Sequence, residues 1–279
     1  MTDRQTDRQT DRQTDRIEFI DVARGIGILL VVFGHMISEK SPLYTVIYSF
    51  HMPFFFFLSG VFAKPEIRFK QYLQKNSKKL LVPFVVVFFV GIIYTGVMSG
   101  FSSINLFDVF KQFVFARPIG LNVGPIWFLA CLFDVTLIFF VLYKLILSKK
   151  NNIISIFVLG GICVFAYYLP LIENRFNLFL PFKFDVAFMA TIFYTLGFLL
   201  KGTVLKGIDP QKCYHKIIIL VFSVFVITLI PYLVIGQTFL SGGIYGKDIF
   251  LYIFTAFCGS ILIIYLGIIL KKSRFLSYI

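Results

Sequence analysis

The chain has 279 residues, of which 58% are hydrophobic and 15% are charged, with 37 Phe and 14 Tyr against a single Trp. This composition excludes an ordinary soluble domain and predicts an all-α, polytopic membrane protein. The formal net charge of +13 does not indicate nucleic-acid binding, because the basic residues fall in short clusters between apolar segments, as membrane topology requires.

The N-terminal segment, residues 1–16, consists after Met1 of three copies of Thr-Asp-Arg-Gln followed by Thr-Asp-Arg. Alternating charge with no apolar face predicts a disordered, solvated tail. The unit can be encoded by ACA-GAC-AGA-CAG, which is also three copies of the tetranucleotide ACAG. Such a tract can slip during replication, so we hypothesise phase variation, an on/off switching of expression. Mixed synonymous codons across the repeats would contradict it.

Eight apolar stretches follow and predict a helix bundle of about eight transmembrane spans. Alternate inter-span segments are rich in lysine and arginine, with sixteen such residues on one side and six on the other. By the positive-inside rule both termini are then cytoplasmic. The partly apolar segment 101–122 is expected to form a surface or re-entrant piece on the outer side. The expected spans are 17–38, 44–62, 80–99, 123–147, 152–171, 184–200, 217–236 and 249–270.

The first span carries charge at a depth where charge is costly. Its uncharged run, 25–38, is too short to cross about 30 Å of hydrocarbon, so Asp21 and Arg24 must lie at membrane depth if the segment spans. Eleven helical steps bring His35 to within about 20° of Arg24 around the axis and ~16 Å further along it. One face then offers a fixed cation and a proton acceptor. The alternative is a topology-setting Arg with a packed His.

Five collinear motifs extend this pattern over residues 17–200. They are Arg24-x10-His35 within Phe19-Ile-Asp-Val-Ala-Arg-Gly-Ile-Gly-Ile, Ser49-Phe-His-Met-Pro-Phe-Phe-Phe-Phe-Leu-Ser-Gly60, Lys78-Lys-Leu-Leu-Val-Pro83, Gly124-Pro-Ile-Trp-Phe-Leu-Ala130 and Phe193-Tyr-Thr-Leu-Gly-Phe-Leu-Leu200. Together they resemble the integral-membrane acyltransferase-3 family, especially its fucose 4-O-acetylase-like branch.

The resemblance implies an O-acyltransferase of the bacterial cytoplasmic (inner) membrane. Its donor is cytoplasmic acyl-CoA, expected to be acetyl-CoA, and its acceptor is a hydroxyl of a surface glycan or glycolipid such as lipopolysaccharide, capsule or exopolysaccharide. Residues 17–279 are expected to form the acyltransferase domain. The family usually has about ten spans, so by comparison the domain is expected to be short of one or two C-terminal helices. Lys75-x3-Lys79 stands where the family often has Arg-x3-Arg.

Three residues are the catalytic candidates. A histidine suits removal of the proton from a sugar hydroxyl, and we expect His35 to be the general base. His51 is expected to position the acceptor hydroxyl or the thioester carbonyl, with helix packing beside Pro53 as the alternative. Arg24 is expected to bind donor phosphates or a thioester carbonyl, and Asp21, three residues before it, can pair with it.

The remaining candidates bind substrates. The most basic inter-span segment is expected to hold the CoA phosphates through Arg68, Lys75, Lys78 and Lys79. The alternative is that these residues only set the membrane topology and contact anionic lipids. Trp127 is expected to stack on a sugar ring or to sit in the interfacial aromatic belt. Asp134 and Asp185 are carboxylates in apolar spans and count as acceptor-site candidates, although Asp185 also fits a headgroup contact.

Other functions remain open at this point. Direct transfer with His35 as base is the first mechanism and an acyl-histidine relay the second. A transporter or flippase of a glycolipid or small solute would also use a buried Arg and His, and a truncated, inactive acyltransferase is a third reading. The four scattered cysteines show no metal or disulfide spacing, and neither a phosphate-binding glycine loop nor a nucleophile elbow is present.

Overall fold

The computed structural model describes residues 17–101, 104–116, 126–149, 152–176, 178, 180–206 and 213–270. Within these ranges the chain forms helices and no strand, apart from an isolated bridge between Phe239 and Ile244. The predicted all-α class is therefore confirmed. The repeat tail, residues 1–16, lies outside the described residues, as do Gly124 and Pro125 of the fourth motif.

Seven helices in the described part of the chain are long and apolar enough to cross a membrane. They match seven of the eight expected spans. The expected span 217–236 falls on α12 and η6, of which the stretch Phe222–Ile235 is a shorter apolar helix. The seven are Glu18–Met36, Pro42–Val61, Phe69–Ser99, Trp127–Lys149, Ile153–Glu173, Pro181–Leu199 and Ile249–Ile269.

The individual elements follow in chain order. The first half holds α2 (Glu18–Met36), α3 (Pro42–Tyr48), α4 (His51–Val61), α5 (Phe69–Asn76), the π-helical η1 (Ser77–Leu81), α6 (Val82–Ser99) and α7 (Leu106–Phe115). The second half holds α8 (Trp127–Leu145), η4 (Leu147–Lys149), α9 (Asn152–Phe176), η5 (Pro181–Lys183), α10 (Phe184–Leu199), α11 (Lys201–Lys206), α12 (Cys213–Ile230), η6 (Pro231–Ile235), η7 (Leu240–Gly242) and α13 (Ile249–Ile269).

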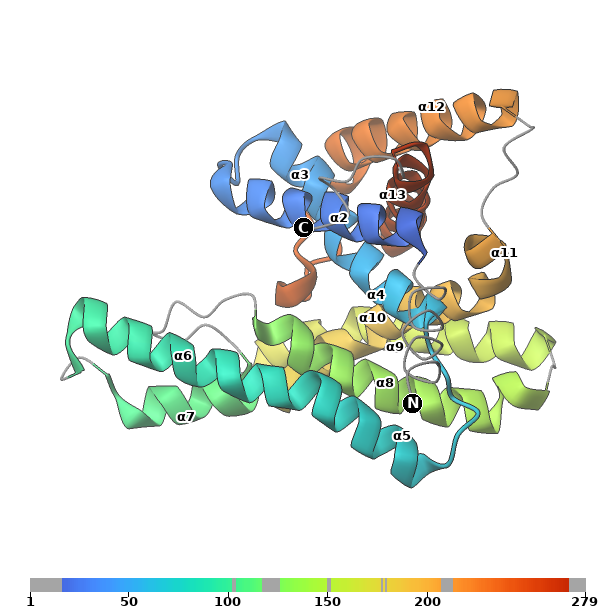
Figure 1. Cartoon of the computed structure of the whole chain (residues 1–279). Helices are drawn as coiled ribbons and strands as arrows, with labels where there is room; N and C mark the ends of the chain where they lie inside the picture. The colour runs from blue at the N-terminus through green and yellow to red at the C-terminus, as the bar shows by residue number, and fades with distance from the viewer. Residues whose placement is uncertain are drawn as a thin grey trace, which may run out of the picture.

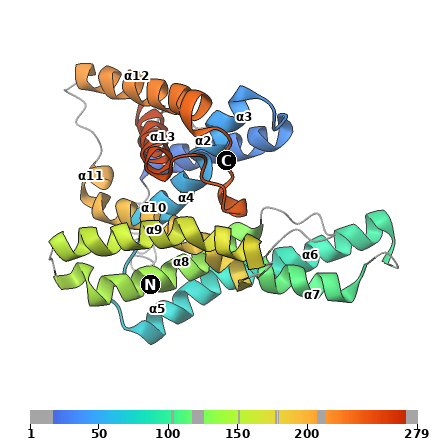
Figure 2. The same ribbon diagram turned by 180° about the vertical axis from the view of Figure 1, so that it is seen from behind.

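The helices gather in two groups joined by a central pair. One group contains α2, α3, α12 and α13, and the other contains α5 to α9 (Figures 1 and 2). Helices α4 and α10 run between the groups and pack on each other. Helix α4 also contacts α2 and α13, whereas α10 also contacts α8 and α9. The centre of the molecule is therefore the crossing of α4 and α10.

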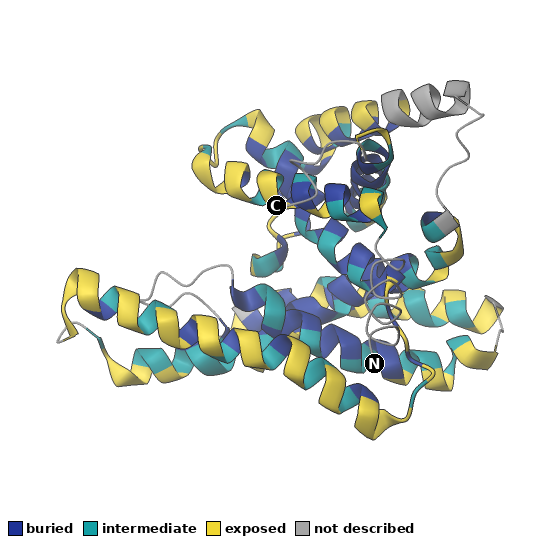
Figure 3. Ribbon diagram, in the orientation of Figure 1, coloured by how far each residue is buried: buried dark blue, intermediate teal, exposed yellow. Residues whose placement is uncertain are grey.

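Small residues make that crossing possible. A Cβ built on Gly60 of α4 would overlap the backbone carbonyl of Tyr194 on α10, and one on Gly197 of α10 would overlap the carbonyl of Phe57 on α4. Reciprocal glycines let the two backbones touch. Burial follows this geometry, since 72% of the second span is buried but only 17% of the fifth (Figure 3).

The second span, expected over 44–62, is broken between α3 and α4. Helix α3 ends at Tyr48 and α4 begins at His51, with Phe50 at φ −140° between them. Pro53 explains the position of the break. It has no N–H to give to the carbonyl of residue 49, and its ring disfavours a helical carbonyl there. The break thus lies about one helical turn before Pro53.

Two other segments differ in detail from the sequence prediction. Residues 69–79, expected to connect spans two and three, are helical and continue into α6 as one helix, Phe69–Ser99. Helix α7 folds back along α6, since the Phe113 ring lies 5.5 Å from Phe84 and 5.1 Å from Phe88. That the described part of 101–122 is a surface or a re-entrant piece stays a prediction.

Candidate functional site

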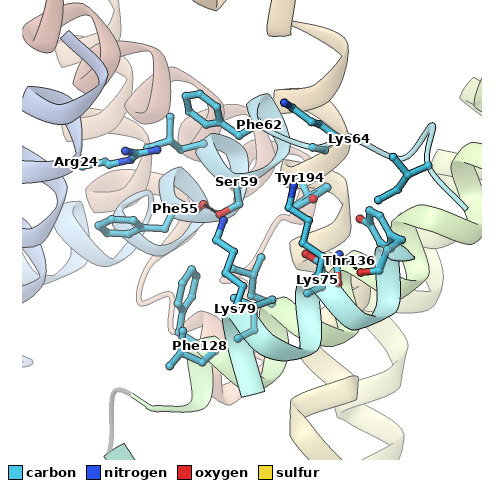
Figure 4. A pocket seen from close by; sticks show the side chains of 18 of the residues that line it. Arg24, Phe55, Ser59, Phe62, Lys64, Lys75, Lys79, Phe128, Thr136 and Tyr194 are labelled. Carbon is cyan, nitrogen blue, oxygen red and sulfur yellow. Dashed lines mark hydrogen bonds between the residues drawn. The ribbon is translucent and has the colours of Figure 1, made fainter. Parts of the chain in front are cut away.

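A cavity of about 570 Å³ lies where α2, α4, the 69–99 helix, α8 and α10 meet (Figure 4). Its walls have a cationic end and an apolar end. The cationic end carries Arg24, Lys64, Lys75 and Lys79. The apolar end carries Ile28, Phe55, Phe128, Leu129 and Leu132.

Helical spacing explains how these side chains converge. Phe55, Ser59 and Phe62 lie four and three residues apart, so they occupy one face of α4 and its C-cap. Lys75 and Lys79 are likewise four apart on one helix, and in Figure 4 they rise from it toward α4. Arg24 reaches the same space from α2 on the other side.

Arg24 is held by two contacts. Its Nη1 donates to Asp21 Oδ1 at 3.1 Å, which confirms the expected pair within the first span. Its guanidinium also lies 5.2 Å from the ring centroid of Phe62, a cation–π contact. The Arg24 side chain is 46% exposed, so it remains accessible from the cavity. Together these contacts fix the direction of the guanidinium without enclosing it.

Apart from the Asp21 partner of Arg24, the four cations of the cavity face no negative charge among its described lining residues. Among the described residues that line it, none is an aspartate or glutamate. Like charges gathered around one space repel one another and raise the local potential. An anionic ligand with several charges would relieve this repulsion, so the cationic end is suited to phosphate groups.

The apolar end is lined by aromatic rings. Phe55 and Phe128 lie 6.1 Å apart in edge-to-face geometry. Phe55 also lies against the backbone of α2, because a Cβ on Gly27 would sit 2.9 Å from its ring. The rings of Phe55 and Phe128 therefore bridge α2, α4 and α8 at one side of the cavity, away from Lys64 (Figure 4).

His35 and His51 lie beyond this wall and do not line the cavity. His35 occupies the last turn of α2 and is exposed, whereas His51 is 3% exposed at the start of α4. Tyr48 joins them, with its ring centroid 6.4 Å from that of His35 and 4.7 Å from that of His51, both edge-to-face. The structure thus brings the two histidines to one aromatic residue.

The break in the second span sets the tautomer of His51. Its Nδ1 lies 2.8 Å from the carbonyl oxygen of Ile47, in α3 just before the break. A carbonyl only accepts, so Nδ1 must carry the proton, and in the neutral ring Nε2 is the free lone pair. The imidazole satisfies a backbone group near the break and presents its other nitrogen as a base or acceptor.

The other predicted residues lie apart from the cavity. Arg68 is exposed at the N-cap of α5, and Lys78 is exposed on η1. Trp127 is 8% exposed and packs 6.3 Å from both Phe56 and Phe128. Asp134 and Asp185 are also buried, at 9% and 2% exposed.

Several lining residues were not predicted from sequence. Lys64 follows the second span and belongs to the same basic segment as Lys75, so its position was a usable signal. Tyr194 lies in the fifth motif and reaches the cavity from α10. Tyr48 gave no signal, since its role depends on the break between α3 and α4 and on Gly34, where a Cβ would sit 3.1 Å from the Tyr48 ring.

Fold and site together define a polytopic membrane protein with a cationic internal cavity at one end of its first span and a histidine at the other. The family model of the acyltransferase-3 "Acyltransferase domain" matches residues 17–279. The chain therefore belongs to the acyltransferase-3 family of membrane acyltransferases.

The chain is also similar to one characterised protein. Nodulation protein NolL of Sinorhizobium fredii is 27% identical over 235 residues, which cover 78% of this chain and 57% of NolL. The match thus spans little more than half the length of that relative. No solved structure matches the chain.

Proposed function

We propose that the protein transfers an acyl group, expected to be acetyl, from cytoplasmic acyl-CoA to a hydroxyl of a cell-surface glycan or glycolipid. Family membership supports acyl transfer. The observation that carries the donor assignment is the cavity, with four cations at one end, an apolar wall at the other and no carboxylate among its described lining residues. The expected placement is the bacterial inner membrane.

The donor assignment follows from charge and shape. Acyl-CoA carries a pyrophosphate and a 3′-phosphate on one part and an uncharged thioester on the other. Phosphates fit beside Arg24, Lys75 and Lys79, and the acyl group fits beside Phe55 and Phe128. The positive-inside rule places this cationic end on the cytoplasmic side, where CoA thioesters are made.

The acceptor is proposed to arrive from the opposite side, at the His35 end of α2. His35 is exposed there and takes the proton of the acceptor hydroxyl as its oxygen attacks the thioester carbonyl. The new C–O bond forms, the C–S bond breaks, and the leaving CoA thiolate takes a proton from the His35 imidazolium. His51, with Nδ1 held by Ile47, offers Nε2 to orient the hydroxyl.

The test uses membranes that contain the chain or its His35→Ala variant. These are supplied with acetyl-labelled CoA and host glycolipids, and label in alkali-labile ester on glycan is counted. We expect label that depends on His35. Equal label in both would remove His35 from the chemistry, and no label with folded, inserted protein would favour the transporter or the truncated enzyme.

A further inference from the structure

The cavity ends one helical turn short of the histidine pair. Phe55, its deepest residue on α4, is four residues after His51, so the two lie about 6 Å apart along the helix axis. An acyl carbonyl held in the cavity must therefore meet the acceptor at the aromatic wall. The side chains that form this wall therefore limit the space available to the acyl chain beyond the carbonyl.

The wall is built from aromatic rings that contact one another. Phe55 contacts Phe54 at 5.2 Å and Phe128 at 6.1 Å, and Phe128 contacts Phe56 at 4.8 Å. Behind Phe55, the backbone of α2 is close because residue 27 is glycine. In Figure 4 the labelled Phe55 and Phe128 lie on the side of the cavity away from Lys64.

We propose that Phe55 and Phe128 set the length of acyl chain that the enzyme transfers, by forming an end wall that admits a short acyl group and stops a longer one. This inference rests on the proposed function, because it takes acyl-CoA as the donor. Its physical basis is close packing. A methylene that has no room must displace a ring from its contacts, and each misplaced methylene changes selectivity by about 10-fold or more.

The experiment compares transfer from acetyl-, butyryl- and hexanoyl-CoA by the wild-type chain, Phe55→Ala, Phe128→Ala and Phe62→Ala. Phe62 lies at the cationic end of the same cavity, so its variant enlarges the cavity without opening the wall. We expect the hexanoyl-to-acetyl ratio of kcat/KM to rise about 10-fold or more in the two wall variants. In Phe62→Ala transfer from all three donors should fall together and the ratio should stay.

A second readout needs no turnover. Trp127 is the single tryptophan of the chain, and its ring lies 6.3 Å from Phe128. Its fluorescence can follow binding of S-ethyl- to S-hexyl-CoA ethers to purified protein. We expect the hexyl ether to bind Phe55→Ala about 10-fold more tightly than the wild type, and the ethyl ether to bind both alike.

The outcomes separate the two proposals. Acetyl transfer with an unchanged chain-length ratio in both wall variants would overturn the acyl-length role and leave the proposed function standing. Failure of every variant and of the wild type to transfer or bind any CoA derivative would overturn the proposed donor, and the acyl-length role with it.

Discussion

The backbone carbonyl of Tyr194 on α10 lies directly against the Cα of Gly60 on α4. The same Tyr194 contributes to the lining of the cavity. The contact that sets the distance between the two central helices therefore also places a wall of the proposed donor site.

Gly60→Ala tests this contact. A Cβ there must displace backbone, so we expect the variant to lose about 3 kcal/mol or more of stability, measured by thermal unfolding in detergent. Gly160→Ala on α9 is the matched control, because a Cβ there meets nothing within 4 Å. It should leave stability unchanged or slightly raised. Equal effects of the two substitutions would contradict the close crossing.

Donor binding should depend on which lysine is removed and not on total charge. Lys75→Gln and Lys79→Gln each remove a cation that lines the cavity, and we expect each to weaken CoA binding about 10-fold. Lys78→Gln changes the same net charge at an exposed position outside the lining. Binding of CoA to purified protein measures the difference. A similar loss in Lys78→Gln would favour a general basic surface.

Arg24 should matter through its guanidinium as well as its charge. Arg24→Ala is expected to lower donor kcat/KM about 100-fold, and Arg24→Lys to recover part of it, because lysine keeps the cation but not the planar fork. Asp21→Asn removes the partner that holds Arg24 at 3.1 Å. Its transfer rate should fall far less than that of Arg24→Ala. An Asp21→Asn loss as large would assign Arg24 a structural role.

His51 is expected to have a structural role and a chemical role, and two substitutions can separate them. His51→Ala removes the 2.8 Å hydrogen bond to the carbonyl of Ile47, which keeps the backbone N–H of Phe50 at 3.3 Å, and we expect a loss of about 1 kcal/mol in thermal unfolding. Asparagine places an amide N–H near the position of Nδ1 but has nothing at Nε2. His51→Asn should therefore keep most of the stability and still lose transfer. Full activity in a stable His51→Asn would make the residue purely structural.

Tyr48 is expected to act through its ring. Its edge-to-face contacts with His35 and His51 survive in Tyr48→Phe, which should transfer at close to the wild-type rate. Tyr48→Ala removes a buried aromatic residue at a cost of about 3–5 kcal/mol. It should also lower the transfer rate. The ratio of the two variants' rates is the measurement, and a large defect in Tyr48→Phe would point to the hydroxyl instead.

The sequence predicted the features that depend on composition and local spacing. Seven spans and the Asp21–Arg24 pair follow from apolar runs and from i, i+3 geometry on one helix. The convergence of Lys75 and Lys79 with Arg24 could only be guessed from charge. Their meeting depends on the crossing of α4 and α10 and on the helix 69–99, both of which are set by contacts between residues far apart in sequence.

The contacts between the aromatic rings and the histidines were harder still to predict from the sequence. Tyr48 is one tyrosine among fourteen, and nothing in its neighbours marks it until the break after α3 turns it toward α2. No sequence signal indicated that the Trp127 ring packs against Phe56 and Phe128. In a chain so rich in Phe, periodicity does not reveal which rings face one another.

The uninterrupted helix Phe69–Ser99 has a consequence for the membrane around the protein. Its 31 residues extend about 46 Å, well beyond the ~30 Å of a hydrocarbon core, so it must tilt or project from the bilayer. Lys75 and Lys79 belong to this helix. A change in the tilt of the helix would therefore move both lysines relative to Arg24 on α2. If the proposed donor site is correct, bilayer thickness becomes a determinant of donor affinity, through hydrophobic mismatch.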